Sequence, residues 1–376
     1  MLKNNKIFKT SDLQKLDKYT IENEPVTSLD LMERAATVFT EKLLIFFPNS
    51  HIFNILAGSG NNGGDGYVVA RLLCQNGLNV KVFGLHENDH LSPDCAVNRE
   101  RFINMGGCYI EVKNPDNLQP DENSVLVDAI FGAGLNRPVT GFLGDIIRRI
   151  NGLSHPVVAI DMPSGLMGED NGENNGAIIK ADYTFTFQFP KLAFMFPENV
   201  VYVGHWEVLD IRLHPVILRE YPAAYYYLTE EVVTSRLLIP AKFSHKGTLG
   251  NTLLIVGSYS MMGAAVLAAK GAIRSGTGLL SVHVPRKLKE MIHLSVPEAL
   301  VEVDRNEFCF SGVDNLSRFQ AVGIGSGIGT SPVTAEGIRQ LLSVWRGKIV
   351  LDADALNLLA ADSGLLELLP DGAVLT

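Results

Sequence analysis

Gly58-Ser-Gly-Asn-Asn-Gly-Gly-Asp-Gly66 is the stretch of sequence that decides the fold. A short apolar run, residues 51–57, precedes it, and a segment with helical character, residues 67–75, follows it. Gly58, Gly60 and Gly63 fit the spacing G-x-G-x-x-G, which between a strand and a helix brings backbone N–H groups close to a phosphate. The stretch therefore predicts a nucleotide-binding α/β unit.

Outward from this loop, predicted strands and helices alternate. Apolar runs predict further strands at 79–85, 125–131, 156–160, 183–189 and 200–203, and apolar periodicity predicts helices within 11–47 and at 93–105 and 142–150. Repeated strand–helix units indicate a mostly parallel sheet that is covered on both faces. We therefore expect a Rossmann-like, doubly wound domain over residues 1–213.

A second α/β series follows a break in the pattern. Residues 214–228 are rich in Pro and Tyr and are expected to form a linker. Beyond them, strands are predicted at 251–256, 279–284, 321–324 and 348–351, and helices at 263–275 and 332–345. Residues 372–376 look like one more strand, so we expect the second domain, 229–376, to be incomplete.

Composition excludes several classes of protein. The 376 residues are 46% hydrophobic and 19% charged, with a net charge of −9. An acidic surface disfavours nucleic-acid binding, and no run approaches the ~20 apolar residues that span a membrane. The N-terminus does not resemble a secretory signal, and the four cysteines form no disulfide framework. We expect a cytoplasmic protein with a small-molecule ligand.

The side chains of the glycine loop distinguish it from a plain dinucleotide loop. In a redox dinucleotide fold, the loop would bind the pyrophosphate mainly through its backbone, and Glu87 would be the candidate acid that binds the ribose. Here Asn61 and Asn62 add amides, and Asp65 places a carboxylate near the start of a helix, where a phosphate would repel it. A bound cation would relieve that repulsion if other oxygens converged on it.

Two other predicted strands end in such oxygens. Asp128 lies in the run Asp128-Ala-Ile-Phe-Gly132, and Asp161 lies in Ile160-Asp-Met-Pro-Ser-Gly165. An aspartate at a strand end is often a turn former, but three acidic loops in one sheet favour a shared site. Carboxylate, hydroxyl and amide oxygens together suit a hard cation.

These segments resemble the NAD(P)H-hydrate epimerase family. The resemblance rests on Leu31-Met-Glu-Arg-Ala35, Gly60-Asn-Asn-Gly-Gly-Asp-Gly66, Asp128-Ala-Ile-Phe-Gly132, Ile160-Asp-Met-Pro-Ser-Gly165 and Ala181-Asp-Tyr-Thr-Phe-Thr186, in the family's order. It implies that the enzyme interconverts the R and S forms of hydrated NADH and NADPH. It also implies Asp161 as the catalytic acid/base and a potassium ion held by Asn62, Asp128 and Ser164. The implied substrate-binding residues are Asp161 and two loops: Asn61, Asn62, Gly63, Gly64, Asp65, Gly132, Ala133, Gly134, Leu135, Asn136, Arg137 and Pro138.

The second half resembles the ribokinase-like dehydratase domain of bifunctional members. Ser244-His-Lys-Gly247, Leu254-Ile-Val-Gly-Ser258, Gly323-Ile-Gly-Ser-Gly-Ile-Gly-Thr330 and Val350-Leu-Asp-Ala-Asp354 carry this resemblance. It implies ADP or ATP as cofactor, with Ala264 and Gly327 on the substrate side. Asp352 and Asp354 could be site residues or helix caps. The family's later His loop and Gly-rich catalytic loop are not in these 376 residues, so dehydratase activity is expected only if the chain continues.

Two other functions remain open from the residues alone. An NAD-dependent dehydrogenase would use the same glycine loop, but no His or Lys lies in a recognisable hydride-transfer motif. A binding or regulatory protein would keep the cleft without working acid/base groups. A homo-oligomer is expected for the enzyme.

Overall fold

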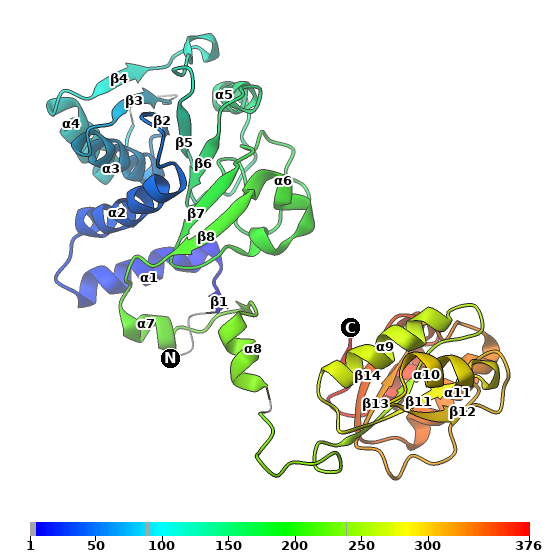
Figure 1. Cartoon of the computed structure of the whole chain (residues 1–376). Helices are drawn as coiled ribbons and strands as arrows, with labels where there is room; N and C mark the ends of the chain where they lie inside the picture. The colour runs from blue at the N-terminus through cyan, green and yellow to red at the C-terminus, as the bar shows by residue number, and fades with distance from the viewer. Residues whose placement is uncertain (1–4, 87–89, 238) are drawn as a thin grey trace. The chain divides into compact units, whose positions relative to one another are not determined.

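The computed structural model describes residues 5–86, 90–237 and 239–376 (Figure 1). The chain divides into two compact units, Met1–Leu237 and Leu238–Thr376. Each unit is built on its own parallel sheet. Among the described residues, no helix is both long enough and apolar enough to cross a bilayer.

The first unit contains a seven-stranded sheet in which every neighbouring pair is parallel, with the order β4-β3-β2-β5-β6-β7-β8. Its strands are β2 (Ile52–Ala57), β3 (Asn79–Gly84), β4 (Cys108–Glu111), β5 (Val125–Ala129), β6 (Val157–Ile160), β7 (Tyr183–Phe187) and β8 (His205–Leu209). A separate antiparallel pair joins β1 (Lys6–Ile7) to β9 (Tyr225–Tyr226).

Some helices of the first unit begin at residues whose side chains cap them. Thr27 and Asp30 form a reciprocal capping box at the second helix, and Ser92 caps the fourth just before Pro93. The helices are α1 (Thr10–Asn23), α2 (Ser28–Phe46), α3 (Asn61–Gln75), α4 (Pro93–Asn104), α5 (Gly141–Asn151), α6 (Val200–Val203), α7 (Pro215–Glu220) and α8 (Glu230–Arg236), with short 3-10 turns at Pro115–Asn117, Leu192–Met195 and Pro197–Asn199.

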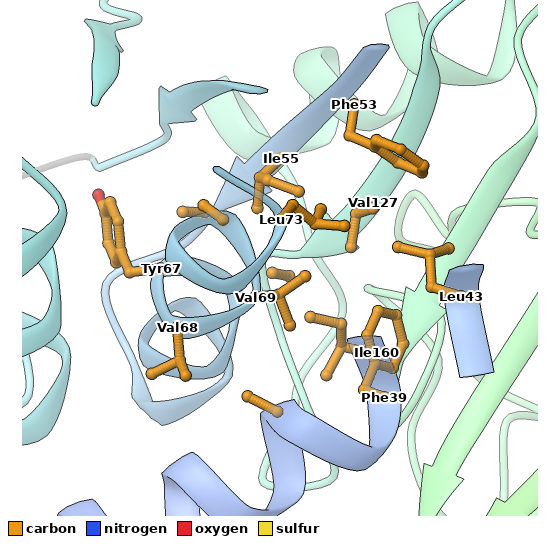
Figure 2. Close-up of a cluster of buried hydrophobic side chains, with 14 of the residues drawn as sticks. Phe39, Leu43, Phe53, Ile55, Tyr67, Val68, Val69, Leu73, Val127 and Ile160 are labelled. Carbon is orange, nitrogen blue, oxygen red and sulfur yellow. The ribbon is translucent and has the colours of Figure 1, made fainter. Parts of the chain in front are cut away.

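Two apolar cores cover the two faces of this sheet. On one face, side chains of α2 and α3 pack on β2, β5 and β6; Figure 2 labels Phe39, Leu43, Val69, Val127 and Ile160 among them. On the other face, α5 buries three isoleucines against the sheet, including Ile146. This double covering explains why the central strands are mostly apolar.

The second unit contains a six-stranded parallel sheet with the order β12-β11-β10-β13-β14-β15. Its strands are β10 (Asn251–Ile255), β11 (Leu279–Val284), β12 (Leu300–Val303), β13 (Ala321–Ile324), β14 (Lys348–Leu351) and β15 (Val374–Leu375). Its helices are α9 (Met262–Arg274), α10 (Lys289–Ser295), α11 (Pro332–Val344) and α12 (Asp354–Ala361), with 3-10 turns at Arg286–Leu288 and Ser363–Leu368.

Two segments differ from the sequence prediction. The strand predicted at 200–203 is wrong: these residues form α6, which continues from the 3-10 turn at Pro197–Asn199 and ends at Gly204, where φ is 59°. The strand that pairs with β7 begins after that glycine, at His205. The prediction relied on the strand propensity of the valines, which is weak and is overridden here by the helical turn that precedes them.

The segment 214–228, expected to be a linker, is structured within the first unit. Pro215 begins α7, and β9 pairs with β1. The ammonium of Lys6 donates hydrogen bonds to three carbonyl oxygens of this segment, those of Leu218, Arg219 and Tyr221. The N-terminal residues therefore hold it, a long-range interaction that composition does not reveal.

Candidate functional site

A cavity of about 590 Å³ opens at the carboxyl ends of the central strands of the first unit. The chain runs outward from β2 to β4 and then returns to β5 beside β2, so the loops after these two strands diverge. Ligands of doubly wound sheets bind at such a switch point. The wall is formed by parts of α1 and α2, by the start of α3, and by the residues that follow β5, β6 and β7.

The glycine loop makes a turn that side chains would block. A β-carbon on Gly63 would lie 2.0 Å from the carbonyl oxygen of Gly58, and one on Gly58 would lie 2.1 Å from that of Ile130. A β-carbon on Gly66 would lie 2.6 Å from that of Ala129 in β5. These glycines let α3 pack directly on the sheet with its N-terminus at the cavity.

The helix after the loop begins earlier than the sequence predicts. It begins at Asn61 rather than Tyr67, so the residues from Asn61 to Asp65 belong to its first turns. Gly60 is its N-cap, and no described side chain caps it. The first N–H groups of a helix have no partner within the helix, and with the helix dipole they form a site for an anion.

Asn62, Asp128 and Ser164 converge on the loop after β5. The Ser164 hydroxyl donates a hydrogen bond to Asp128 Oδ1 at 2.5 Å and accepts one from the N–H of Phe131 at 2.8 Å. On the other side of that loop, the Asn62 amide oxygen lies 3.1 Å from where a β-carbon of Gly132 would be. Asn62 Nδ2 is buried without a hydrogen-bond partner. One amide, one carboxylate and one hydroxyl are thus gathered at a single loop.

Burial dominates the electrostatics of Asp128. It raises the pKa of this carboxyl to about 6, although hydrogen bonds from the Ser164 side chain and backbone and from Ile130 oppose the shift. A carboxylate in such a place favours a nearby cation. Among the described residues, no cluster of three or more His, Cys, Asp or Glu side chains could hold a metal, so a cation here would need amide and hydroxyl oxygens.

Asp161 projects from the end of β6 in an unusual backbone conformation. Its φ is 64°, which a non-glycine residue rarely adopts. Its Oδ1 accepts hydrogen bonds from the Lys191 ammonium at 2.6 Å, the Phe187 N–H at 3.0 Å and the Thr186 hydroxyl at 3.1 Å. Lys191 is 1% exposed, and both it and Asp161 line the cavity. The carboxylate is therefore held rigidly by one oxygen.

Two further carboxyl groups face the same cavity. Burial and the charge of Asp161 raise the pKa of Asp17 to about 6, while Lys191 opposes this shift. Burial, followed by the charges of Asp161, Asp17 and Asp94, raises the pKa of Asp65 well above its ordinary value. The cavity thus gathers the carboxyl groups of Asp17, Asp65, Asp94 and Asp161 around the ammonium group of Lys191.

The structure brings most of the predicted site residues together. The cavity is lined by Asn61, Asn62, Asp65, Gly132, Ala133, Gly134, Leu135, Asn136, Arg137 and Asp161. Gly63, Gly64 and Pro138 support the loops but do not line it, and Asp128 and Ser164 lie behind the loop after β5. Glu87, the candidate acid of the dehydrogenase alternative, lies outside the described residues.

Sequence reasoning missed Asp17 and Lys191. Asp128 and Asp161 were singled out because they are charged residues at the ends of predicted strands. Lys191 also follows a predicted strand, so the same signal could have found it. Asp17 carried no such signal. It lies in the middle of α1, and only the packing of that helix over the cavity reveals it.

In the second unit, the predicted residues meet at the corresponding switch point, between β10 and β13. A β-carbon on Gly327, whose φ is 71°, would lie 2.8 Å from that of Ala264. Asp352 accepts a hydrogen bond from the Ser326 hydroxyl, and Asp354 accepts one from the N–H of Gly329. Both aspartates therefore hold the Gly-rich loop, and Asp354 is not the N-cap of α12, which is Ala353.

Comparisons with known proteins assign each half of the chain. Residues 28–193 match the family of YjeF-related protein N-termini, and residues 252–376 match the NAD(P)H-hydrate dehydratase family. The α/β fold class is confirmed, with a Rossmann-like unit followed by a ribokinase-like one. A Bacillus subtilis ADP/ATP-dependent NAD(P)H-hydrate dehydratase, co-crystallised with ATP/Mg²⁺, is 32% identical and covers 34% of this chain and 46% of its own, with a TM-score of 0.30.

Curated relatives match nearly the whole chain. The bifunctional NAD(P)H-hydrate repair enzyme Nnr of Moorella thermoacetica is 32% identical over 95% of this chain and 70% of its own length. The enzyme of the same name from Synechocystis is 33% identical over 98% of this chain and 70% of its own. The chain thus spans about 70% of these relatives and matches both of their family models. It belongs to the family of bifunctional NAD(P)H-hydrate repair enzymes.

Proposed function

We propose that the cavity of the first unit binds hydrated NADH or NADPH and interconverts its R and S epimers. The observation that carries this proposal is the placement of Asp161, whose carboxylate is held by Lys191 at the cavity wall. The start of α3 lies at the same cavity, so an anion-binding site and an acid/base group share one space. Family membership supports this reading and does not favour an NAD-dependent dehydrogenase.

The glycine loop is suited to the pyrophosphate of the substrate. The uncapped N–H groups at the start of α3 offer hydrogen bonds to phosphate oxygens, and the helix dipole adds a partial positive charge. Arg137, which lines the cavity, adds a full positive charge. Asn61 and Asn62 of this loop also line the cavity, where their amides can orient the rest of the nucleotide.

Asp161 is the acid/base group of this proposal. Hydration of a reduced nicotinamide adds a hydroxyl to the ring carbon bonded to nitrogen, because the ring double bond is an enamine. The product is a hemiaminal, and it can invert only if that carbon becomes planar. A group that accepts and returns the hydroxyl proton speeds this change. Lys191, Thr186 and the backbone of Phe187 occupy Oδ1 of Asp161.

The assay that tests this function is the exchange of the R and S forms, followed by chromatography against an enzyme-free blank. Asp161→Asn keeps the shape of the side chain but cannot accept a proton, so we expect a loss of about 100- to 10,000-fold in rate. Asp145→Asn is the matched control, because Asp145 is an exposed residue of α5 that pairs with Arg148. Near-normal exchange in folded Asp161→Asn would remove Asp161 from the reaction.

We also propose that Asn62, Asp128 and Ser164 hold a potassium ion. Their amide, carboxylate and hydroxyl oxygens suit a hard cation. The buried Asn62 amide nitrogen has no hydrogen-bond partner, so the amide can turn its oxygen toward an ion without breaking a hydrogen bond of that nitrogen. When bound, the ion would supply positive charge near the phosphates and the buried Asp128.

Potassium binding is measurable without turnover. A ligand that binds only the folded state stabilises it by about 1–3 kcal/mol at 10- to 100-fold excess over its Kd. We expect KCl to raise the unfolding midpoint more than NaCl does at equal ionic strength, and Ser164→Ala to abolish the difference. Ser154→Ala, at an exposed position, should keep it. Equal effects of the two salts would argue against the ion.

For the second unit we propose a nucleotide-dependent dehydratase fold, with ADP or ATP as cofactor and with Ala264 and Gly327 beside the substrate. The close packing of these two residues supports this assignment, because larger side chains at either position would not fit at this switch point. Self-association and a cytoplasmic location stay predictions from the sequence.

A further inference from the structure

The helix α1 brings a carboxyl group to the cavity that the proposed function does not yet use. Asp17 lines the cavity together with Leu13, Leu16 and Ile21 of the same helix. Both ends of α1 are fixed: the Thr10 N–H donates to Glu169 at 2.6 Å, and the Thr20 hydroxyl accepts from the His214 N–H at 3.1 Å. Asp17 is therefore held at the cavity by a rigid element.

The environments of Asp17 and Asp161 differ sharply. Asp161 receives three hydrogen bonds, one of them from a buried ammonium group. The carboxyl of Asp17 has no hydrogen-bond partner among the described residues, although it is only partly exposed. Burial and the charge of Asp161 raise the pKa of Asp17 to about 6. The Asp161 carboxylate is thus held by three donors, whereas the Asp17 carboxyl is able to hold a proton near neutral pH.

The charged groups that act on Asp17 lie on other elements. Asp161 after β6 raises the pKa of Asp17 and Lys191 lowers it, while Asp65 on α3, Asp94 on α4 and Arg137 also line the cavity. Asp65 is the other candidate proton carrier. Burial, followed by the charges of Asp161, Asp17 and Asp94, raises its pKa as well, but Asp65 lies at the start of α3 beside the glycine loop, where the substrate pyrophosphate is proposed to bind.

Inversion of a hemiaminal through ring opening needs two proton-transferring groups at once. The C–N bond breaks and leaves its electron pair on nitrogen, the O–H bond breaks, and a C=O bond forms. One group takes the hydroxyl proton and a second gives a proton to the nitrogen. Closure on the other face of the aldehyde returns both protons. Two carboxyl groups in different environments are a usual means of supplying such a pair.

We propose that Asp17 is a second catalytic residue of the epimerase, the proton donor to the ring nitrogen, acting while Asp161 takes the hydroxyl proton. This inference rests on the proposed function of the first unit. In the reverse half of the cycle Asp17 takes the proton back from nitrogen, and Asp161 returns its proton to the oxygen. No other reactant is consumed.

The test compares four proteins in the R/S exchange assay: wild type, Asp17→Asn, Asp17→Ser and the control Glu22→Gln. Glu22 lies on the same helix, is exposed and forms an ion pair with Lys18. We expect kcat of both Asp17 variants to fall at least ~100-fold, as for the loss of a positioned general acid, with KM changed less than about threefold. The fall in wild-type rate at higher pH, where Asp17 loses its proton, should disappear in the variants. Glu22→Gln should match wild type.

The outcomes separate this inference from the proposed function. If wild type exchanges the epimers and either folded Asp17 variant keeps kcat within about threefold, Asp17 is not a proton donor. A rise in KM at unchanged kcat would likewise make Asp17 only part of the cavity wall. An unchanged pH profile in a slowed variant would assign it a structural role and overturn the proposal. If wild type itself exchanges nothing, the proposed function fails and this inference fails with it.

Discussion

At the scale of single residues, the ion pair of Lys191 and Asp161 is the most consequential feature of the site. Lys191 is 1% exposed and also donates hydrogen bonds to Thr186 and to the carbonyl oxygen of Phe189. Such a pair gains little net stability over apolar residues, because both charges lose their hydration. Removing one partner, however, leaves the other buried and uncompensated. The pair therefore makes the fold of this loop depend on the Asp161 carboxylate.

Lys191→Met should therefore destabilise the first unit by about 3–5 kcal/mol, the usual cost of an unpaired buried charge. Urea unfolding followed by fluorescence measures this loss. The control is Lys42→Met, which removes a partly exposed pair with Glu207 and should cost less than about 1 kcal/mol. Lys191→Met combined with Asp161→Asn should recover part of the stability. A loss as small as that of Lys42→Met would mean that the pair is not buried in solution.

The aspartates at strand ends could be predicted from the sequence, whereas the pairing of Lys191 with Asp161 and the position of Asp17 could not. Asp128 and Asp161 follow apolar runs, and parallel strands end at one edge of a sheet. Lys191 reaches Asp161 because the chain reverses at Gln188, where φ is 59°. Glutamine gives no warning of such a turn, since Gly or Asn is the usual residue there.

At the scale of elements, α1 shows how a helix far from the glycine loop in sequence completes the site. Its apolar residues could be predicted to face a core, but the sequence cannot say which core. Contacts with Glu169 and His214, more than 100 residues away, fix its position. By contrast, β2, α3 and β3 follow one another along the chain. Their order could be predicted because these elements pack against their neighbours in sequence.

The burial of Asp17, on the side of α1 that lines the cavity, makes the free energy of unfolding depend on pH. Its pKa is about 6 in the folded chain against 3.8 ordinarily, so the folded state favours the protonated form. The resulting stability is complete below pH 3.8, falls as pH rises toward 6 and is gone above it. Relative to wild type, Asp17→Asn should thus gain nothing at pH 4 and up to ~3 kcal/mol at pH 8, at 1.36 kcal/mol for each pKa unit.

Urea unfolding of both proteins at pH 4, 6 and 8 checks this expectation. Glu22→Gln, on the exposed face of the same helix, should show no such pH-dependent gain. A constant difference between Asp17→Asn and wild type across this range would mean that Asp17 is as well hydrated in the folded chain as in the unfolded one.

At the scale of the whole molecule, each of the two units has, among the described residues, its own large parallel sheet, its own apolar cores and its own switch point. The sequence contains two tryptophans, and each unit holds one of them, Trp206 in β8 and Trp345 after α11. Trp345→Phe therefore leaves a protein whose tryptophan fluorescence reports on the first unit, and Trp206→Phe leaves one that reports on the second. The stability of each core can then be followed in the full chain.

The division into two cores predicts how a core substitution is felt. Phe39 is fully buried in the first core, against Phe185, so Phe39→Ala should cost about 3–5 kcal/mol there. In the Trp345→Phe background the urea midpoint should fall accordingly. In the Trp206→Phe background the same substitution should shift the Trp345 signal by less than about 0.5 kcal/mol, as distant, independent sites do. Leu341→Ala in the second core should give the reverse pattern. Equal shifts of both signals would show instead that the chain unfolds as one cooperative body, so that damage to either site would be felt at the other.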